Sequence, residues 1–297
     1  MAMVQMQTVQ SFTDSTALLA RPEALRERAQ EDGYLYFKGL IPRDEVLGMR
    51  ALVLNHCHAL GWLDPAAPRN EGRVTASFTP IIEGQPAWYP FYRLLYTRRE
   101  LHAFNQHPRV MAACRTLFNG AVLAHPRVIV RAIFPRATRF TTPPHQDYFY
   151  IGGTPNTWTS WIPLGDCPSQ LGGLAIAPGS HKHGLMETQA AEGAGGRRVE
   201  VDEDRQWVRG DYEAGDVIIF HSHTIHQGRD NLTDQLRLSC DFRYQPLSEK
   251  VREDSLEPHM RADTDPWQQI YAGWDQQDPL RFYWQRLPVQ VLKWGET

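Results

Sequence analysis

The chain has 297 residues, of which 42% are hydrophobic and 22% charged, and its formal net charge is -3. These are globular values, and the charge gives no reason to expect nucleic acid or an anionic membrane as a partner. The four cysteines form no CxxC pair, so neither a disulfide framework nor a zinc-thiolate site is expected. The start lacks a signal-peptide pattern, and no apolar run is long enough to span a bilayer. We expect a cytoplasmic protein and leave its oligomeric state open.

Residues 1–120 are predicted to be mostly helical, with a short aromatic strand between the first two helices. The helices begin or end at typical signals such as an early proline or a following glycine. Residues 72–96 are rich in aromatics and turn formers and have no clear period. The expected helices are 22–30, 43–60 and 99–118, the last interrupted near His107 and Pro108, and the expected strand is 34–37.

After Gly120 the pattern changes to short strands separated by glycine and proline turns. Residues 191–196 are predicted to form a flexible loop tip between two of them. Many short strands with such turns indicate a sandwich or barrel rather than a parallel α/β sheet. The expected strands are 128–134, 157–164, 174–177, 216–220 and 236–244.

The last part, residues 248–297, carries four tryptophans, which a disordered tail would usually lack. We predict a helical segment that packs back on the β core. The whole chain, 1–297, is thus expected to be one catalytic domain. Its parts are a helical support (1–120), a β core with the active site (121–247) and the packing segment, whose tryptophans are Trp267, Trp274, Trp284 and Trp294.

A His-x-Asp motif, His145 and Asp147, carries the first sign of chemistry. On extended backbone, residues two apart point to the same face, which would set an imidazole beside a carboxylate. Such triplets arise often by chance, so the motif needs a third ligand. The predicted strand 216–220 is followed by His221, His223 and His226. Two histidines and one carboxylate form the facial triad typical of non-haem iron(II) oxygenases. We expect His221 and His223 to be ordinary hydrogen-bonded groups.

The strand predicted at 236–244 alternates strictly between apolar and polar residues. A surface strand with its polar face in water explains this pattern, and so does a barrel strand whose polar face lines a site. An arginine and a serine two residues apart can bind a carboxylate together, through a guanidinium fork and a hydroxyl donor. The polar face consists of Arg237, Ser239, Asp241 and Arg243.

Five motifs in this order resemble the phytanoyl-CoA dioxygenase family of 2-oxoglutarate oxygenases. The opening E-D-G-Y-L-Y-F-K-G-L-I-P at 31–42 resembles the usual start of that family. The likeness extends from about residue 31 to 244 and is weak at 72–96 and in the tail. It implies a mainly β fold with flanking helices, a double-stranded β-helix or jelly-roll, cupin-like barrel. The motifs are H-Q-D (145–147), W-I-P-L (161–164), G-G-L-A-I-A-P-G-S-H (172–181), G-D-V-I-I-F with a later histidine (215–220), and R-L-S (237–239).

The resemblance also implies a ligand set. In the family, the His-x-Asp pair and a late histidine ligate iron, and an arginine 11 residues beyond that histidine holds the distal carboxylate of 2-oxoglutarate. Of the three late histidines only His226 has an arginine, Arg237, at this offset. The implied metal ligands are therefore His145, Asp147 and His226. Ser239 fits the serine that accompanies the arginine, and Trp161 either lines the co-substrate pocket or belongs to the core.

The implied function is hydroxylation or desaturation of an unactivated C–H bond of a small molecule, with iron(II), 2-oxoglutarate and O2. An intermediate of a biosynthetic or secondary-metabolite pathway is our preferred substrate class. Arg131, Tyr148 and Tyr150 are candidates for the substrate pocket, with a salt bridge or core packing as the ordinary alternatives. Two other functions stay open: a cupin-like metalloprotein whose reaction needs no 2-oxoglutarate, and a non-catalytic binding domain.

Overall fold

The computed structural model describes residues 10–260 and 265–293, and its first part is helical as predicted. Gly33 ends the first helix with a φ of 72°, and a Cβ there would lie 2.3 Å from Nδ1 of His181. The interruption expected near Pro108 separates two helices. One helix was not predicted, because it lies in the aromatic-rich stretch without a clear period. The helices are α1 (Pro22–Asp32), α2 (Arg43–Ala59), α3 (Tyr89–Tyr96), α4 (Arg99–Asn105) and α5 (Pro108–Phe118), α3 being the new one.

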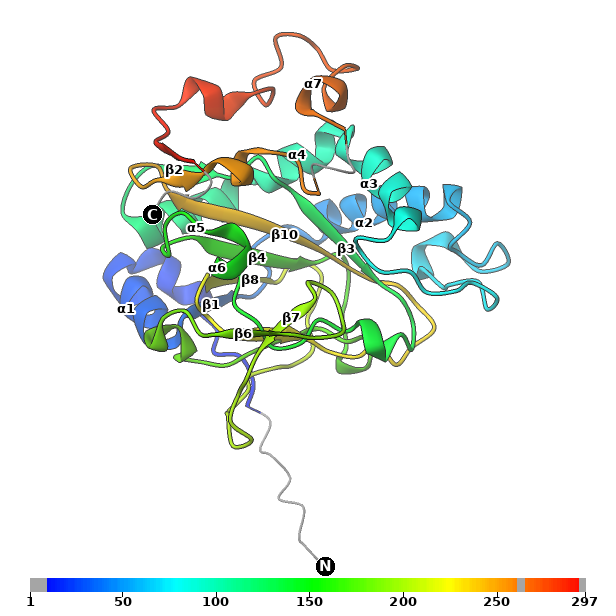
Figure 1. Cartoon of the computed structure of the whole chain (residues 1–297), viewed down its shortest axis with the longest axis horizontal. Helices are drawn as coiled ribbons and strands as arrows, with labels where there is room; N and C mark the ends of the chain where they lie inside the picture. The colour runs from blue at the N-terminus through cyan, green and yellow to red at the C-terminus, as the bar shows by residue number, and fades with distance from the viewer. Residues whose placement is uncertain (1–9, 261–264, 294–297) are drawn as a thin grey trace, which may run out of the picture.

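A six-stranded antiparallel sheet forms the centre of the molecule, in the order β1-β8-β4-β10-β2, with β3 also paired to β10. Figure 1 shows α2, α3 and α4 along one side of this sheet. The largest hydrophobic core lies between the helices and the apolar face of the sheet. The strands are β1 (Tyr34–Phe37), β2 (Val122–Ala124), β3 (Ile129–Ile133), β4 (Trp158–Pro163), β8 (Val217–His221) and β10 (Arg237–Pro246).

A second, smaller sheet faces the other side of the main sheet. It pairs β5 (Leu174–Ile176) with β9 (His226–Gly228), and isolated bridges extend it from His226 to His145 and from Ile176 to Val208. A second apolar cluster, which includes Tyr34, Trp161 and Ile176, lies between the two sheets. The expected double-stranded β-helix is confirmed, although the pairing among the described residues does not close into a barrel.

The loop tip predicted at 191–196 connects β6 (Thr188–Ala190) to β7 (Arg197–Val199) in a hairpin. The prediction of a helical tail was wrong. The described part of the tail has no long helix: it holds one-turn helices, namely the 3-10 turns η7 (Glu253–Leu256) and η8 (Tyr283–Arg286) and the α-helical turn α7 (Trp267–Ile270), and a short strand, β12 (Val291–Leu292), which pairs with β11 (Val251–Arg252). Recurring prolines explain the difference, because each lacks the N–H that a helix interior needs.

The tail nevertheless packs against the rest of the molecule, as Figure 1 shows in orange and red. Trp267 and Trp284 are buried in the main core and Trp274 packs against it, while Trp294 lies outside the described residues. All four cysteines are buried and unpaired. No helix in the described part of the chain is long and apolar enough to cross a membrane.

Candidate active site

Three side chains predicted as metal ligands meet between the two sheets. His145 and His226 exchange backbone hydrogen bonds of 3.0 Å in both directions, which brings their ring centroids to 4.1 Å. Oδ1 of Asp147 lies 3.7 Å from Nε2 of each histidine. All three residues are buried, and their candidate ligand atoms lie within 4.8 Å of one another. The arrangement has the residue types and spacing of a facial triad.

The backbone of the His-x-Asp motif differs from the prediction. His145 is extended and bridged to His226, but Asp147 has helical angles (φ -64°, ψ -30°) and precedes the one-turn helix α6 (Tyr148–Ile151). The chain turns here because it leaves the small sheet, and Ile151 donates a backbone hydrogen bond back to Asp147. The carboxylate is therefore directed by the helical turn and its hydrogen bonds, not by strand alternation.

Both histidines present Nε2 to the centre of the triad. Nδ1 of His145 lies 2.9 Å from the carbonyl of Pro143, and Nδ1 of His226 lies 2.9 Å from the carbonyl of Thr224. A carbonyl only accepts, so each Nδ1 carries the proton and each Nε2 keeps its lone pair. Burial lowers the pKa of His145 to about 3 and also lowers the pKa of His226. Both rings are neutral near pH 7, which is the form that binds a metal.

The two oxygens of Asp147 have different partners. Burial acts to raise the pKa of Asp147, but Arg243, the two triad histidines and Thr159 outweigh it and hold that pKa below its usual range. Thr159 donates to Oδ2 at 2.6 Å, and Arg243 donates to the same oxygen at 3.4 Å. Oδ1 is left facing the histidines, which favours a monodentate ligand.

Arg237 and Ser239 lie together on the buried polar face of β10. Nη1 of Arg237 donates to Oγ of Ser239 at 2.8 Å, and the guanidinium carbon lies 5.8 Å from the ring centre of Trp161. Nε of Arg237 has no partner among the described residues. Arg237 and Trp161 line a small hollow that His226 also borders. The surface-strand alternative is excluded, since every residue of β10 is buried.

A larger cavity of about 530 Å³ opens on the other side of His145 and Asp147. Its walls come from the loop before α3, the 191–196 loop, β3, α6, β10 and the start of the tail. Tyr150 lines it and donates to the carbonyl of Gly195 at 3.1 Å. Cavities of this size hold small-molecule ligands. The residues with titratable or apolar side chains are Glu83, Arg127, Ile129, Arg131, His145, Asp147, Tyr150, Ile151, Ala194, Arg243, His259 and Met260.

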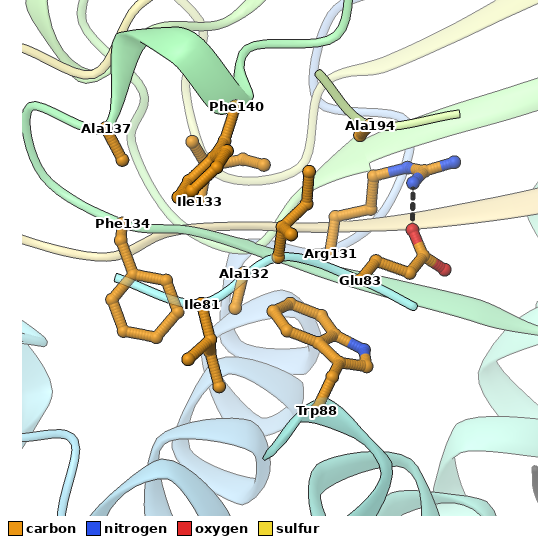
Figure 2. Close-up of a pocket in the computed structure, with 11 residues that line it drawn as sticks. Ile81, Glu83, Trp88, Arg131, Ala132, Ile133, Phe134, Ala137, Phe140 and Ala194 are labelled. Atoms are coloured by element: carbon orange, nitrogen blue, oxygen red, sulfur yellow. Dashed lines mark hydrogen bonds and ion pairs between the residues drawn. The ribbon is translucent and has the colours of Figure 1, made fainter. Parts of the chain in front are cut away.

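Arg131 lines this cavity and is held between two carboxylates. Its Nε donates to Asp241 at 2.6 Å, and its Nη1 donates to Glu83. Figure 2 shows the second ion pair near apolar side chains that come from the loop before α3, from β3 and from the segment after β3. His259 of the tail and Tyr92 of α3 also contact the Glu83 carboxylate. The salt bridge given above as the alternative for Arg131 is thus present. Through it Arg131 connects the loop and the tail to the sheet, while it also lines the cavity.

Three candidates lie apart from the two cavities. Tyr148, in α6, packs edge-on against His223 with ring centroids 4.8 Å apart, and it is not among the described residues that line the cavity. His221 and His223 are outside the triad group, and His221 packs against His181 with ring centroids 5.4 Å apart. Burial lowers the pKa of His221 to about 3. Neither histidine was expected to ligate metal, and the structure places neither of them in the triad.

Sequence reasoning missed Thr159, Glu83 and His259. Thr159 lies two residues before Trp161 on β4, so strand alternation alone would have set it on the same face. Glu83 lies in the loop without a clear period, and His259 in the tail, so no local pattern could show that they meet. Asp241 and Arg243 were placed on the polar face of their strand but were given no role.

Comparison with known proteins agrees with this geometry. The family model for phytanoyl-CoA dioxygenase matches residues 29–239. The chain belongs to this family. It is 31% identical over 267 residues to the 1-deoxypentalenic acid 11-beta-hydroxylase of Streptomyces exfoliatus, an alignment that covers 84% of this chain and 90% of the relative. Its class is that of the iron- and 2-oxoglutarate-dependent dioxygenases.

Two solved structures share the fold. One is the epimerase SnoN of nogalamycin biosynthesis, in complex with Fe3+, alpha ketoglutarate and nogalamycin RO. It has a TM-score of 0.56, 20% identity, and coverage of 78% of this chain and 86% of that one. The other is the alpha ketoglutarate-dependent carbocyclase SnoK, with a TM-score of 0.55, 22% identity, and coverage of 86% and 95%. At these identities the likeness supports the fold.

Proposed function

We propose that His145, Asp147 and His226 hold iron(II), and that Arg237, Ser239 and Trp161 hold 2-oxoglutarate beside it. The buried triad carries the assignment of the metal, because two neutral imidazoles and one carboxylate present three donor atoms to one point. The unpartnered Nε of the buried Arg237 supports the assignment of the co-substrate. A buried cation without a carboxylate partner is costly, and an anionic ligand would supply that partner.

The substrate we infer is a small carboxylic acid with an apolar body, which the enzyme hydroxylates. The curated relative acts on 1-deoxypentalenic acid by its name, and the alignment covers 84% of this chain and 90% of the relative. The cavity fits this chemistry, since Ile129, Ile151 and Met260 line it together with arginines. We further propose that the chain is one catalytic domain, because loop, sheet and tail residues all border this cavity.

The side chains of the site have separable tasks in this proposal. Iron(II) with 2-oxoglutarate and O2 supplies the oxidising chemistry when bound. Thr159 and Arg243 hold Oδ2 of Asp147, so that Oδ1 stays directed at the metal position. The carbonyls of Pro143 and Thr224 fix the tautomer of the two histidines. The loop and the tail narrow the entrance and keep water from the substrate.

The test is 2-oxoglutarate turnover by the purified protein with iron(II), ascorbate and 1-deoxypentalenic acid. We expect succinate release that depends on the acid, and a product heavier by one oxygen atom in mass spectrometry. If the protein releases no succinate with iron(II) and 2-oxoglutarate, whichever substrate is added, the enzyme class is refuted. Release that occurs without an oxidised acid would refute the substrate class alone.

A further inference from the structure

Three arginines line the larger cavity, and two of them each donate hydrogen bonds through Nε and through a terminal nitrogen. Arg131 is paired with Glu83 and Asp241. Arg127 donates to the backbone carbonyls of Asp254 and Glu257, so it holds the start of the tail. The third arginine, Arg243, differs from both.

Arg243 is a buried cation with an incomplete set of partners. Only 5% of the residue is exposed. Within the described part of the chain its guanidinium makes one long hydrogen bond, 3.4 Å to Oδ2 of Asp147, and its Nε has none. That acceptor is already held by Thr159 at 2.6 Å. A guanidinium has five N–H donors, and leaving them unmet in a buried site costs free energy that a bound anion would restore.

The charges around the cavity balance before a ligand binds. The ionised groups that line it among the described residues are three arginines (Arg127, Arg131 and Arg243) and two carboxylates (Glu83 and Asp147), and Asp241, which pairs with Arg131 at 2.6 Å, supplies a third carboxylate. Asp254 approaches Arg127 at 3.9 Å, but it is bound more closely by Arg252 at 2.6 Å. An anion would therefore be bound by the unmet donors of Arg243 and not by an excess of positive charge.

We propose that Arg243 is the receptor for the substrate's carboxylate, which binds the guanidinium where it lines the cavity and leaves the apolar body of the acid in the rest of the cavity. This inference rests on the proposed function and assigns it a specificity-determining residue. The carboxylate is thereby anchored beside Asp147, so the distance from the acid group to the oxidised carbon is fixed by the enzyme. A carboxylate of 2-oxoglutarate has the same chemistry, and the experiment separates the two sources.

The experiment compares an acid with its methyl ester on the unmodified protein and three variants. Isothermal titration calorimetry measures 1-deoxypentalenic acid and its methyl ester binding to the Ni(II)- and 2-oxoglutarate-loaded protein, which does not turn over. The variants are Arg243→Gln and, as a matched control, Arg43→Gln, which removes an exposed arginine paired with Asp166 on the surface. Arg243→Lys is a third variant that keeps the charge but loses the planar fork.

In the unmodified protein we expect the acid to bind at least about tenfold more tightly than the ester, the factor that corresponds to 1.4 kcal/mol. Arg243→Gln should bring the affinity for the acid down to that for the ester and leave the ester unchanged. The affinity of Arg243→Lys for the acid should lie between the affinities of the unmodified protein and of Arg243→Gln. The affinity for 2-oxoglutarate should stay within about twofold in all variants, and Arg43→Gln should behave as the unmodified protein. Because Arg243 also holds Oδ2 of Asp147, Arg243→Gln should weaken Ni(II) binding, so every variant is titrated at a Ni(II) concentration that saturates it.

Several results would refute the assignment of Arg243 as the receptor for the substrate's carboxylate. An unmodified protein that binds Ni(II) and 2-oxoglutarate but binds acid no better than ester refutes it without using a variant. Loss of 2-oxoglutarate affinity in Arg243→Gln, with the preference for acid retained, assigns the residue to the co-substrate instead. Loss of Ni(II) affinity in Arg243→Gln, with the preference for acid over ester retained, would show that Arg243 orients Asp147 and does not bind the substrate. An unmodified protein that binds neither Ni(II) nor 2-oxoglutarate refutes the proposed function itself.

Discussion

Replacement of Arg237 by glutamine tests the co-substrate site most directly. The residue is 4% exposed, its Nη1 donates to Ser239, and its Nε has no partner. If a carboxylate of 2-oxoglutarate completes these contacts, the variant loses a charge-assisted pair inside a buried site. Removing one partner of such a pair costs about 2–5 kcal/mol. The dissociation constant for 2-oxoglutarate should rise by about 30-fold at the lower end of that range.

Ser239→Ala provides a graded companion to this variant. The serine contributes one neutral hydroxyl, whose loss costs about 1 kcal/mol, or roughly a fivefold weaker affinity. Both variants should keep the protein's affinity for Ni(II), because neither residue belongs to the triad group. Neither should lower the stability of the ligand-free protein as much as it lowers co-substrate binding, since Nε of Arg237 is already unmet there.

The measurement is calorimetric titration of 2-oxoglutarate into the Ni(II)-loaded protein, with thermal unfolding of each variant as the check on folding. An unchanged dissociation constant in a folded Arg237→Gln protein would refute the assignment. A loss in Ser239→Ala as large as that in Arg237→Gln would contradict the reasoning on charge, because a neutral donor should contribute less than a guanidinium.

The other predictions concern the metal, the pH dependence of stability and the product. His226→Ala should lose Ni(II) binding in calorimetry while His223→Ala keeps it, and the reverse result would show that the wrong histidine was assigned. Burial lowers the pKa of His102 to about 4, so the unfolded chain binds its proton first, and stability is lost as the pH falls from 6.5 towards 4. Between pH 7 and 5 the contribution of His102 is about 2 kcal/mol. Denaturant titrations should show a total loss that is smaller by about this amount in His102→Gln, while the other buried histidines, such as His125, keep their own contributions. A halide could bind the metal only at the position that the carboxylate of Asp147 fills. We therefore expect no chlorinated product in excess chloride, and a product that carries one labelled oxygen when the reaction is run under ¹⁸O₂, both measured by mass spectrometry.

Periodic segments could be predicted from the sequence because their burial is local. The helix at Arg43–Ala59 carries its apolar stripe at helical spacing, and β10 alternates with period two, so each pattern indicates one conformation. The triad residues could be named because the resemblance to the phytanoyl-CoA dioxygenase family implies a motif order and an offset to Arg237 that relate distant strands. The backbone of Asp147 could not, since a two-residue spacing does not distinguish a strand from the start of a helical turn.

The parts that sequence did not predict depend on contacts between distant segments. Glu83 has no periodic neighbours, yet it contacts Arg131, Tyr92 and His259 from three different elements. The tail's tryptophans suggested a helix because their burial was apparent, but prolines limit it to short turns. Burial can be inferred from composition, whereas the partner that buries a residue is fixed by tertiary structure.

The polar face of β10 explains how one strand can serve two ligands. Successive residues on one face of a strand lie about 7 Å apart, so Arg237 and Arg243 are about 20 Å apart along it. Asp241 lies between them and is neutralised by Arg131, which borders both cavities. The polar face of β10 therefore presents Arg237 to the small hollow and Arg243 to the larger cavity. The ion pair of Asp241 with Arg131 lies between these two arginines. A dianion such as 2-oxoglutarate and an acid substrate can then occupy neighbouring sites, each with its own counter-charge.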